Sequence, residues 1–348
     1  MKYIGLDLHK KNIFATVLSE EGKILSKVNI CSKKDDIQYY LKGIGKKEEI
    51  SIAMEASYNW LYYYRTVEDL SDNIVLAHPL KTRIIGEAKI KTDKIDSKAL
   101  AYMLRADMLP RAYVPNKVSM ENKILLRNRI SLVRIRTQIK NKIHVIIDRN
   151  RDCYLALENL TDVFGAAGIK MLKCIKIPSP DCIILAGYLD LIDEINKKIK
   201  ELDSEISKKS LCNKEIDLLK SIPGVGNITA FLINSEIDDI KRFYSKEKLC
   251  SYAGLVPSTH QSGDKCYQGR ITKQGNKFLR WALTEAAQIS IRHSPYFRCQ
   301  YNKIRAKRNH NSAIIAVARK MAEIIYVILK EGSPYIEKPV NLFQMATL

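Results

Sequence analysis

The sequence lacks paired cysteines, long apolar runs and an excess of acid. Its eight cysteines include no C-x-x-C pair and no Cys/His spacing typical of zinc sites, so we expect reduced thiols and a cytoplasmic location. No apolar run has the length that spans a bilayer, and no signal-peptide pattern is present, so we expect no membrane partner. Internal repeats and low-complexity segments are also missing.

Positive charge is abundant. Lys and Arg number 58 against 38 Asp and Glu, which gives a formal net charge of +20. Such an excess favours nucleic acid as the partner, because neutralising phosphates releases counterions, with a membrane surface as the rival. The 348 residues are 46% hydrophobic, enough for sizeable cores. We therefore expect two domains and a connector, with boundaries at 1–118, 119–210 and 211–348.

The first part of the chain alternates between short apolar strands and helical stripes. The pattern predicts helices over 35–42 and 59–70, and strands over 3–8, 13–19, 24–30, 49–57 and 73–79. The order β-β-β-α-β-α-β matches an α/β ribonuclease-H-like fold. In that strand order the first and fourth strands are neighbours.

Two acids stand on these strands, and two more open a helix that follows them. Asp7 lies inside an apolar strand, where a carboxylate is costly unless it is paired or ligates a metal; a solvent-facing strand edge is the alternative. Glu55 ends the fourth strand and would approach Asp7. Asp93 and Asp96 share one face at a helix start, although capping also explains them. Four converging carboxylates would repel one another, and two Mg²⁺ ions, with Mn²⁺ as an alternative, would relieve that repulsion.

The middle of the chain is strongly basic. Residues 119–148 have apolar positions at helical spacing and Arg or Lys at most others, which predicts a long helix that covers nucleic acid with one side. An ordinary helix with a solvated face is the alternative. Residues 190–208 show heptad-like spacing and predict a short coiled coil, with that helix or with a second subunit. Residues 150–188 connect the two. The basic positions that we assign to nucleic acid on this helix are Arg129, Arg134, Arg136 and Lys140.

The last part of the chain is predicted to be mostly helical. Residues 218–235 resemble a helix-hairpin-helix, in which a turn with Gly224 and Gly226 lets backbone amides at a helix start bind a phosphate. A turn packed between two helices is the alternative. Further helices are expected over 278–294 and 312–332.

Ser262 lies in a glycine-containing stretch that reads as a loop, and a basic run follows it. Arg and Lys around a hydroxyl suit a phosphodiester, whose charge they neutralise during attack. A polar hairpin with solvated charges is the alternative. Ser258 is the second candidate for the reactive hydroxyl. The cations assigned to nucleic acid here are Lys265, Arg270 and Lys273.

Together these stretches resemble the DEDD transposases of bacterial insertion sequences, relatives of the Piv-type DNA invertases, over nearly the whole chain. Ser57-Tyr58 departs from the family, which usually has Thr-Gly after the glutamate. The resemblance implies a RuvC-like N-terminal domain, a helical connector and a C-terminal domain with a nucleophilic serine. The matching residues are Gly5-Leu6-Asp7, Met54-Glu55-Ala56, Lys91-Thr92-Asp93-Lys94-Ile95-Asp96, Pro223-Gly224-Val225-Gly226, Gly254-Leu255-Val256-Pro257, Ser262-Gly263 and Gly275-Asn276-Lys277.

The resemblance also implies roles for individual residues. It makes Ser262 the nucleophile that forms a covalent phosphoserine link to DNA. We also assign Lys91, in the matched stretch that holds Asp93 and Asp96, to nucleic acid. Family members use a non-coding RNA from their own element to pair with donor and target DNA. We therefore expect a DNA recombinase of the bacterial cytoplasm that excises and inserts its element as a dimer or tetramer. The metal ligands that the resemblance implies are Asp7, Glu55, Asp93 and Asp96.

The serine hydroxyl needs a proton acceptor, for which a carboxylate such as Asp7 or Asp93 and a metal-bound water are the candidates. Lys265 or Arg270 would stabilise the charge that develops. Two rival functions stay open. A RuvC-like metal-dependent nuclease or Holliday junction resolvase would use activated water and leave no protein–DNA adduct. A non-catalytic nucleic-acid-binding protein would bind DNA and cleave none.

Overall fold

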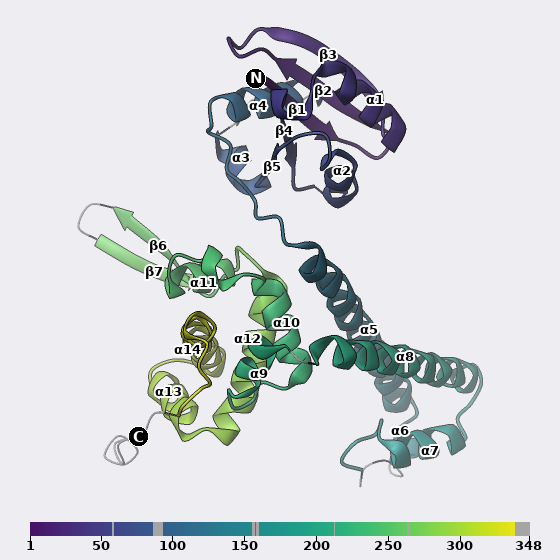
Figure 1. The fold of residues 1–348 in the computed structure, drawn as a ribbon. Helices are drawn as coiled ribbons and strands as arrows, with labels where there is room; N and C mark the ends of the chain where they lie inside the picture. The colour runs from purple at the N-terminus through teal and green to yellow at the C-terminus, as the bar shows by residue number, and fades with distance from the viewer. Residues whose placement is uncertain are drawn as a thin grey trace. The chain divides into compact units, whose positions relative to one another are not determined.

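A computed structural model describes residues 1–57, 59–85, 93–154, 157, 160–211, 213–262 and 265–337. Its contacts divide the chain into two compact units, Met1–Val114 and Pro115–Leu348 (Figure 1). The three-part division at 118 and 210 stays a prediction.

The N-terminal unit is built on a five-stranded sheet with the order β3-β2-β1-β4-β5. β2 pairs antiparallel with β1 and β3, whereas β4 pairs parallel with β1 and β5. All five predicted strands are confirmed, and so is the pairing of the first strand with the fourth. The strands are β1 (Lys2–Leu8), β2 (Asn12–Leu18), β3 (Ile24–Cys31), β4 (Ile50–Glu55) and β5 (Asn73–Ala77).

Apolar side chains on both faces of this sheet are covered by helices. On one face, α1 (Lys34–Ile44) and α2 (Trp60–Val67) pack over a core that includes Leu6. On the other face, α4 (Asp93–Arg105) packs over Ala53 through Leu100. A short turn of helix, η1 (Lys47–Glu49), precedes β4, and α3 (Pro79–Ile85) follows β5. The mixed α/β character predicted for this part of the chain is confirmed.

Helix α4 lies on β1 at a distance that only glycine allows. A Cβ atom at Gly5 would lie 2.1 Å from the backbone oxygen of Ser97. Thr16, opposite Gly5 on β2, and Ser97 are both fully buried, and their hydroxyl oxygens are 2.8 Å apart. At the far end of the helix, Arg105 Nε donates to Glu20 O in the β2–β3 turn at 2.8 Å. Because that turn lies beside the start of β1, α4 runs antiparallel to β1, and its first turn lies where β1 ends.

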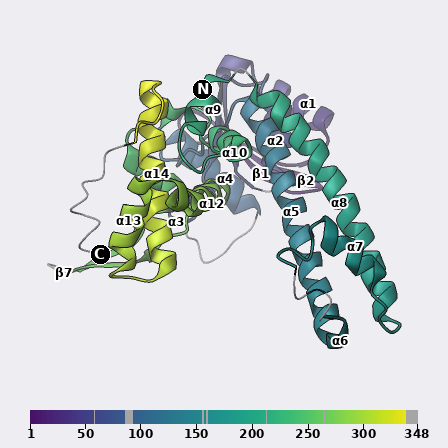
Figure 2. The ribbon, with the colours of Figure 1, turned by 90° about the horizontal axis from the view of Figure 1, so that it is seen from below.

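Two long helices form an antiparallel pair in the C-terminal unit (Figures 1 and 2). α5 (Lys117–Arg149) and α8 (Asp181–Ser210) are joined at two places, by Arg129 with Asp203 and by Arg149 Nη2 with Asp181 Oδ1 at 2.7 Å. The long helix predicted over 119–148 is confirmed.

The segment predicted to connect these two helices is itself largely helical. It holds α6 (Arg151–Tyr154) and α7 (Ala166–Cys174), and α8 begins at Asp181, earlier than the predicted 190. The reason is apolar packing: Leu185 and Leu189 enter a core with Ile143 of α5. Residues 150–188 therefore include the first turns of α8 as well as the connection between the two helices.

The remaining helices surround one large core, in which Phe231, Leu283 and Met321 are at most 2% exposed. The helices predicted over 278–294 and 312–332 are confirmed, as is the mostly helical character of this part of the chain. No helix in the described ranges combines the length and the apolar character that a bilayer crossing requires. The elements are α9 (Lys214–Lys220), α10 (Asn227–Ile237), η2 (Ile240–Arg242), α11 (Lys246–Tyr252), β6 (Pro257–Ser262), β7 (Lys265–Ile271), α12 (Lys277–His293), α13 (Pro295–Arg305) and α14 (His310–Glu331).

Candidate active site and nucleic-acid interface

Asp7 and Glu55 stand at the carboxyl ends of two adjacent parallel strands. The β1–β4 register pairs Gly5 with Ala53, and each acid lies two residues farther along its strand. Side chains two residues apart leave the same face of a sheet, and neighbouring strands are about 4.8 Å apart. Gly5 and Ala53 both face α4. The two acids are therefore neighbours on the face of the sheet that α4 covers.

The other two acid positions lie in the first turn of α4. Asp93 is the first residue of this helix, and Asp96 is partly exposed three residues later. The next residue, Ser97, is the one that contacts Gly5. Because α4 runs antiparallel to β1, its first turn lies at the same end of the sheet as Asp7. The backbone thus brings all four acid positions to one end of one face, while the Asp93 side chain lies outside the described residues.

His9 is a neighbour of Asp7 that the sequence reasoning missed. Its Nε2 lies 3.0 Å from Asp7 Oδ2, and the Asp7 side chain is only 15% exposed. The signal was the spacing, since residues two apart at a strand end share a face. Among the side chains that the structure describes, no three His, Cys, Asp or Glu are grouped closely enough to hold a metal ion.

Ser262 is the last residue of β6, so the predicted loop is a two-stranded hairpin. In the hairpin register Ser262 pairs with Lys265, the first residue of β7. The Ser262 and Lys265 side chains and residues 263–264 lie outside the described part of the chain, as does Lys91. Arg270 and Lys273 are exposed, and Lys273 adopts a left-handed φ of 53°.

Ser258, the second candidate for the reactive hydroxyl, lies at the base of the same hairpin. It packs against Gly269 of β7, where an added Cβ atom would lie 2.4 Å from Ser258 Oγ. Its hydroxyl is thus held close to the backbone of the partner strand.

The four basic positions on α5 differ in what they contact. Arg129 is 17% exposed and pairs with Asp203 of α8. Arg136 Nη1 donates to Asn196 Oδ1 at 2.8 Å, and Lys140 Nζ lies 4.6 Å from the Phe164 ring centroid. Arg134 is exposed. Arg129 therefore holds the helix pair together, and contact with nucleic acid stays a prediction for all four.

The turn between α9 and α10 contains two glycines, of which Gly224 is packed against α12 and Gly226 is not packed against any described atom. Gly224 has a φ of 87°, and a Cβ atom there would lie 2.6 Å from Ser290 Oγ on α12. Gly226 is the N-cap of α10, and no described atom lies within 4 Å of where its Cβ atom would stand. Gly224 is therefore packed against the core, and the approach to the helix start lies on the side of Gly226.

Two family models match the chain. Residues 4–150 match a transposase model, DEDD_Tnp_IS110, and residues 216–302 match the model "Transposase IS116/IS110/IS902 family". The first range contains all four acid positions, and the second contains Ser262. The chain belongs to the IS116/IS110/IS902 transposase family. The resemblance seen in the sequence is thereby confirmed, and membership of a DEDD family implies a requirement for a divalent metal.

Two transposases match most of the chain, and an inverting protein matches part of it. The transposase for insertion sequence element IS1111A of Coxiella burnetii is 25% identical over 347 residues, which covers 96% of this chain and 91% of the relative. The transposase for IS1328 of Yersinia enterocolitica is 24% identical over 292 residues, or 82% and 85%. The pilin gene-inverting protein of Moraxella bovis is 33% identical over 153 residues, or 42% and 48%.

In this member of the family, Lys123 of α5 is buried beside two acids. It is only 6% exposed, and burial lowers the pKa of its ammonium group to about 8, although Glu236 and Asp238 oppose that shift. A lysine on a helix as basic as α5 looks solvated in the sequence. Its burial depends on α10, which is distant along the chain.

We expect Lys123→Met to stabilise the C-terminal unit at pH 7. Folding lowers the pKa from 10.5 to about 8, so the unfolded chain binds this proton more tightly. The penalty is fully present below pH 8 and disappears as the pH rises to 10.5, so the gain of about 2–3 kcal/mol at pH 7 should shrink towards pH 10. Urea unfolding at pH 7, 8.5 and 10 measures this, with the exposed Lys220→Met as the control. A less stable Lys123→Met protein at pH 7 would show that attraction to the two acids outweighs desolvation.

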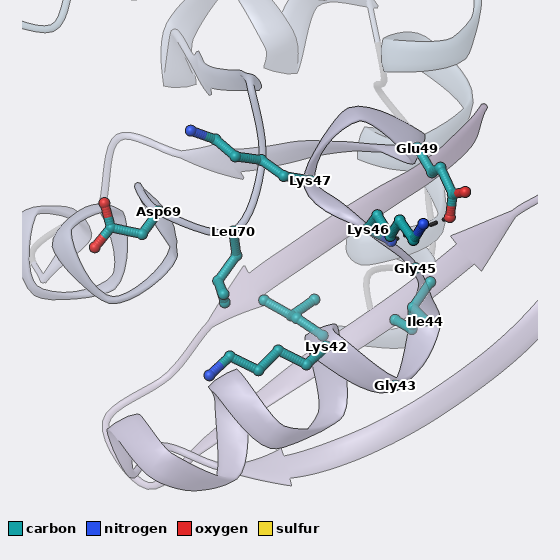
Figure 3. A pocket seen from close by; sticks show the side chains of 10 residues that line it. Lys42, Gly43, Ile44, Gly45, Lys46, Lys47, Glu49, Asp69 and Leu70 are labelled. Atoms are coloured by element: carbon teal, nitrogen blue, oxygen red, sulfur yellow. Dashed lines mark hydrogen bonds between the residues drawn. The ribbon is translucent and has the colours of Figure 1, made fainter.

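A surface pocket lies at the opposite end of the N-terminal sheet (Figure 3). Its wall includes Lys42, Lys46 and Lys47 near the start of β4, whereas Glu55 ends that strand. The Lys46 amide donates to Glu49 Oε2 at 3.1 Å. The pocket is therefore separate from the candidate site.

Proposed function

We propose that this chain cuts and rejoins the DNA of its own insertion element through a covalent link between Ser262 and a DNA phosphate. The observation that carries the proposal is the placement of Asp7, Glu55, Asp93 and Asp96 at one end of one face of the sheet. The family match supports it, because the two matched ranges contain these acids and the serine.

We assign the four acids to two Mg²⁺ ions, with Mn²⁺ as a substitute. The donor set fits, because carboxylate oxygens are the ligands that these hard cations prefer. The sheet order and strand directions support an RNase H-like, RuvC-like assignment for this unit. Bound Mg²⁺ supplies charge stabilisation at the phosphoryl oxygens. His9 acts on the site by holding the Asp7 carboxylate in place.

In the proposed step, a bond forms between Ser262 Oγ and phosphorus as the bond between phosphorus and a deoxyribose oxygen breaks. A base takes the serine proton, and an acid gives a proton to the leaving sugar oxygen, so that the net result is transfer of one proton from the serine to the sugar hydroxyl. One phosphodiester replaces another, so the bond energy is kept for rejoining. The cations at positions 265, 270 and 273 would offset the charge that develops near the hairpin.

In this proposal the exposed cations of α5 bind the nucleic-acid backbone. The start of α10 at Gly226 binds a backbone phosphate, as in a helix-hairpin-helix. The net charge of +20 supports a polyanionic partner. We also propose that the chain uses a guide RNA encoded by its element and that it acts as a homo-oligomer. Both points rest on the family resemblance alone.

The test is a denaturing gel of the protein with labelled element-end DNA, RNA from the element's flanks and Mg²⁺. Wild type and the exposed-serine control Ser251→Ala should give a labelled covalent adduct, and Ser262→Ala and Asp93→Asn should give none. If Ser258→Ala lost the adduct while Ser262→Ala kept it, Ser258 would be the nucleophile.

The same gel separates the two rival functions. Cleavage that survives in Ser262→Ala but stops in Asp93→Asn would identify a metal-dependent nuclease or junction resolvase that uses water. If no protein cleaves the DNA on this gel while a native gel shows that all of them bind it, the chain is a non-catalytic binding protein.

A further inference from the structure

We propose that Glu236 is a positioning residue that fixes the base of the Ser262 hairpin on the C-terminal core. The base consists of two segments, here called the feet of the hairpin: residues 252–256 before β6 and 272–276 after β7. The inference rests on the proposed function for its consequence in DNA rejoining, but its structural part stands on contacts in the C-terminal unit.

Glu236 is a fully buried carboxylate in the middle of the helical core. Arg127 of α5 donates to both of its oxygens, from Nε and from Nη2, at 2.9 Å each. Asn276 Nδ2 donates to Oε2 at 2.7 Å. Burying a carboxylate is costly unless such donors satisfy it, and removing one donor leaves the charge poorly compensated. The three residues therefore form one coupled unit.

Asn276 connects this carboxylate to both feet. Its backbone amide donates to Tyr252 O at 2.7 Å, and its Nδ2 lies 3.2 Å from the Tyr252 hydroxyl. The Tyr252 hydroxyl in turn donates to the Glu236 backbone oxygen at 3.4 Å. The Asn276 Oδ1 caps α12 by accepting from the amides of Phe278 and Leu279. One asparagine thus ties together the first foot, the second foot and the next helix.

The two feet are packed against each other as closely as backbones allow. Gly275 has a φ of 127°, and a Cβ atom there would lie 2.4 Å from Tyr252 O. Gly254 has a φ of 69°, and its Cβ atom would lie 2.7 Å from Gln274 O. The Thr272 amide donates to Val256 O at 2.9 Å and closes the base.

Beyond its feet the hairpin extends away from the helices of this unit (Figure 1), and Tyr267 of β7 is 71% exposed. The direction in which it presents Ser262 is therefore determined at the base. Because Arg127 lies on α5, the same carboxylate also connects the hairpin to the basic helix that we assign to nucleic acid. A displacement of about 1 Å at a reacting group can cost about a hundredfold in rate.

The test reverses the polarity of one hydrogen bond. Asn276→Asp keeps an oxygen that caps α12, but it places a second carboxylate against Glu236. Glu236→Gln combined with Asn276→Asp restores the bond, because the new amide donates to the new carboxylate. Arg127 Nε keeps the remaining oxygen of residue 236 as its acceptor, whereas Arg127 Nη2 loses its acceptor. We expect the single variant to form the DNA adduct ~10- to 100-fold more slowly at saturating DNA, with a DNA Kd within about twofold of wild type, and the double variant to recover most of the rate.

Hydrogen exchange at the amides of Thr272 and Asn276 gives a second readout that does not depend on the chemistry. Faster exchange in Asn276→Asp and recovery in the double variant support the positioning role even if wild type forms no adduct, in which case only the proposed function fails. Unchanged exchange and rate in the single variant would overturn the inference. The inference would also be overturned if the double variant recovered neither the exchange protection nor the adduct rate. That outcome counts in the same way when the single variant does not fold.

Discussion

Asp7→Asn is expected to lower DNA cleavage and rejoining by on the order of a thousandfold or more, with the sheet intact. Asparagine keeps the size of the side chain and one oxygen, but it removes the negative charge that we assign to metal binding. Asp7 is next to Glu55 at the strand ends and is 15% exposed, so the change introduces no large cavity or clash. The measurement is the rate of cleavage of labelled element-end DNA over a range of Mg²⁺ and Mn²⁺ concentrations.

Asp72→Asn is the matched control for this prediction. It removes a carboxylate from the same unit, one that pairs with Lys47 at 3.0 Å and is 58% exposed. Asp72 precedes β5 and so lies at the opposite end of the sheet from Asp7. Its loss should leave the rate within about twofold, since an exposed pair contributes little. A wild-type rate in Asp7→Asn, with the thermal midpoint unchanged, would remove Asp7 from the site.

The N-terminal fold could be predicted because its strands are short, apolar and separated by clear turns. The start of α8 could not. The stretch before position 190 contains Pro178 and Pro180, which favour a connector. In the structure Pro180 is the N-cap of α8, and Leu185 and Leu189 in its first turns belong to a core shared with α5. Only the tertiary partner distinguishes that helix start from a loop.

Some residues of the candidate site could likewise be predicted from the sequence, and others could not. Asp7 is recognisable because burying a carboxylate within an apolar strand is costly unless it is paired or ligates a metal. Glu236 is not, because it precedes Asp238 and Asp239 and looks like part of a solvated acidic run. Its burial and its pairing with Arg127 depend on a contact between residues 109 positions apart. Local patterns find functional groups on regular elements, whereas buried polar networks require the packed structure.

Gly5→Ala is expected to destabilise the N-terminal unit by about 3 kcal/mol or more and to abolish DNA rejoining. The added Cβ atom would lie 2.1 Å from Ser97 O and 2.7 Å from the Ala101 amide nitrogen, both of them backbone atoms of α4. A rotamer change cannot relieve such a clash, so the helix must move off the sheet. Its first turn carries Asp93 and Asp96, so the displacement separates them from the acid on β1. Urea unfolding followed by circular dichroism measures the stability.

Gly43→Ala makes the same chemical change in a helix of the same unit. It lies within α1, where no described atom comes within 4 Å of the new Cβ position, so it should stabilise the unit by about 0.5–1 kcal/mol through helix propensity. The opposite signs separate a steric effect from a general effect of replacing glycine. If Gly5→Ala were as stable as wild type, α4 would have to lie farther from β1 than the structure shows. The convergence of the four acids depends on that same contact, so it would fail as well.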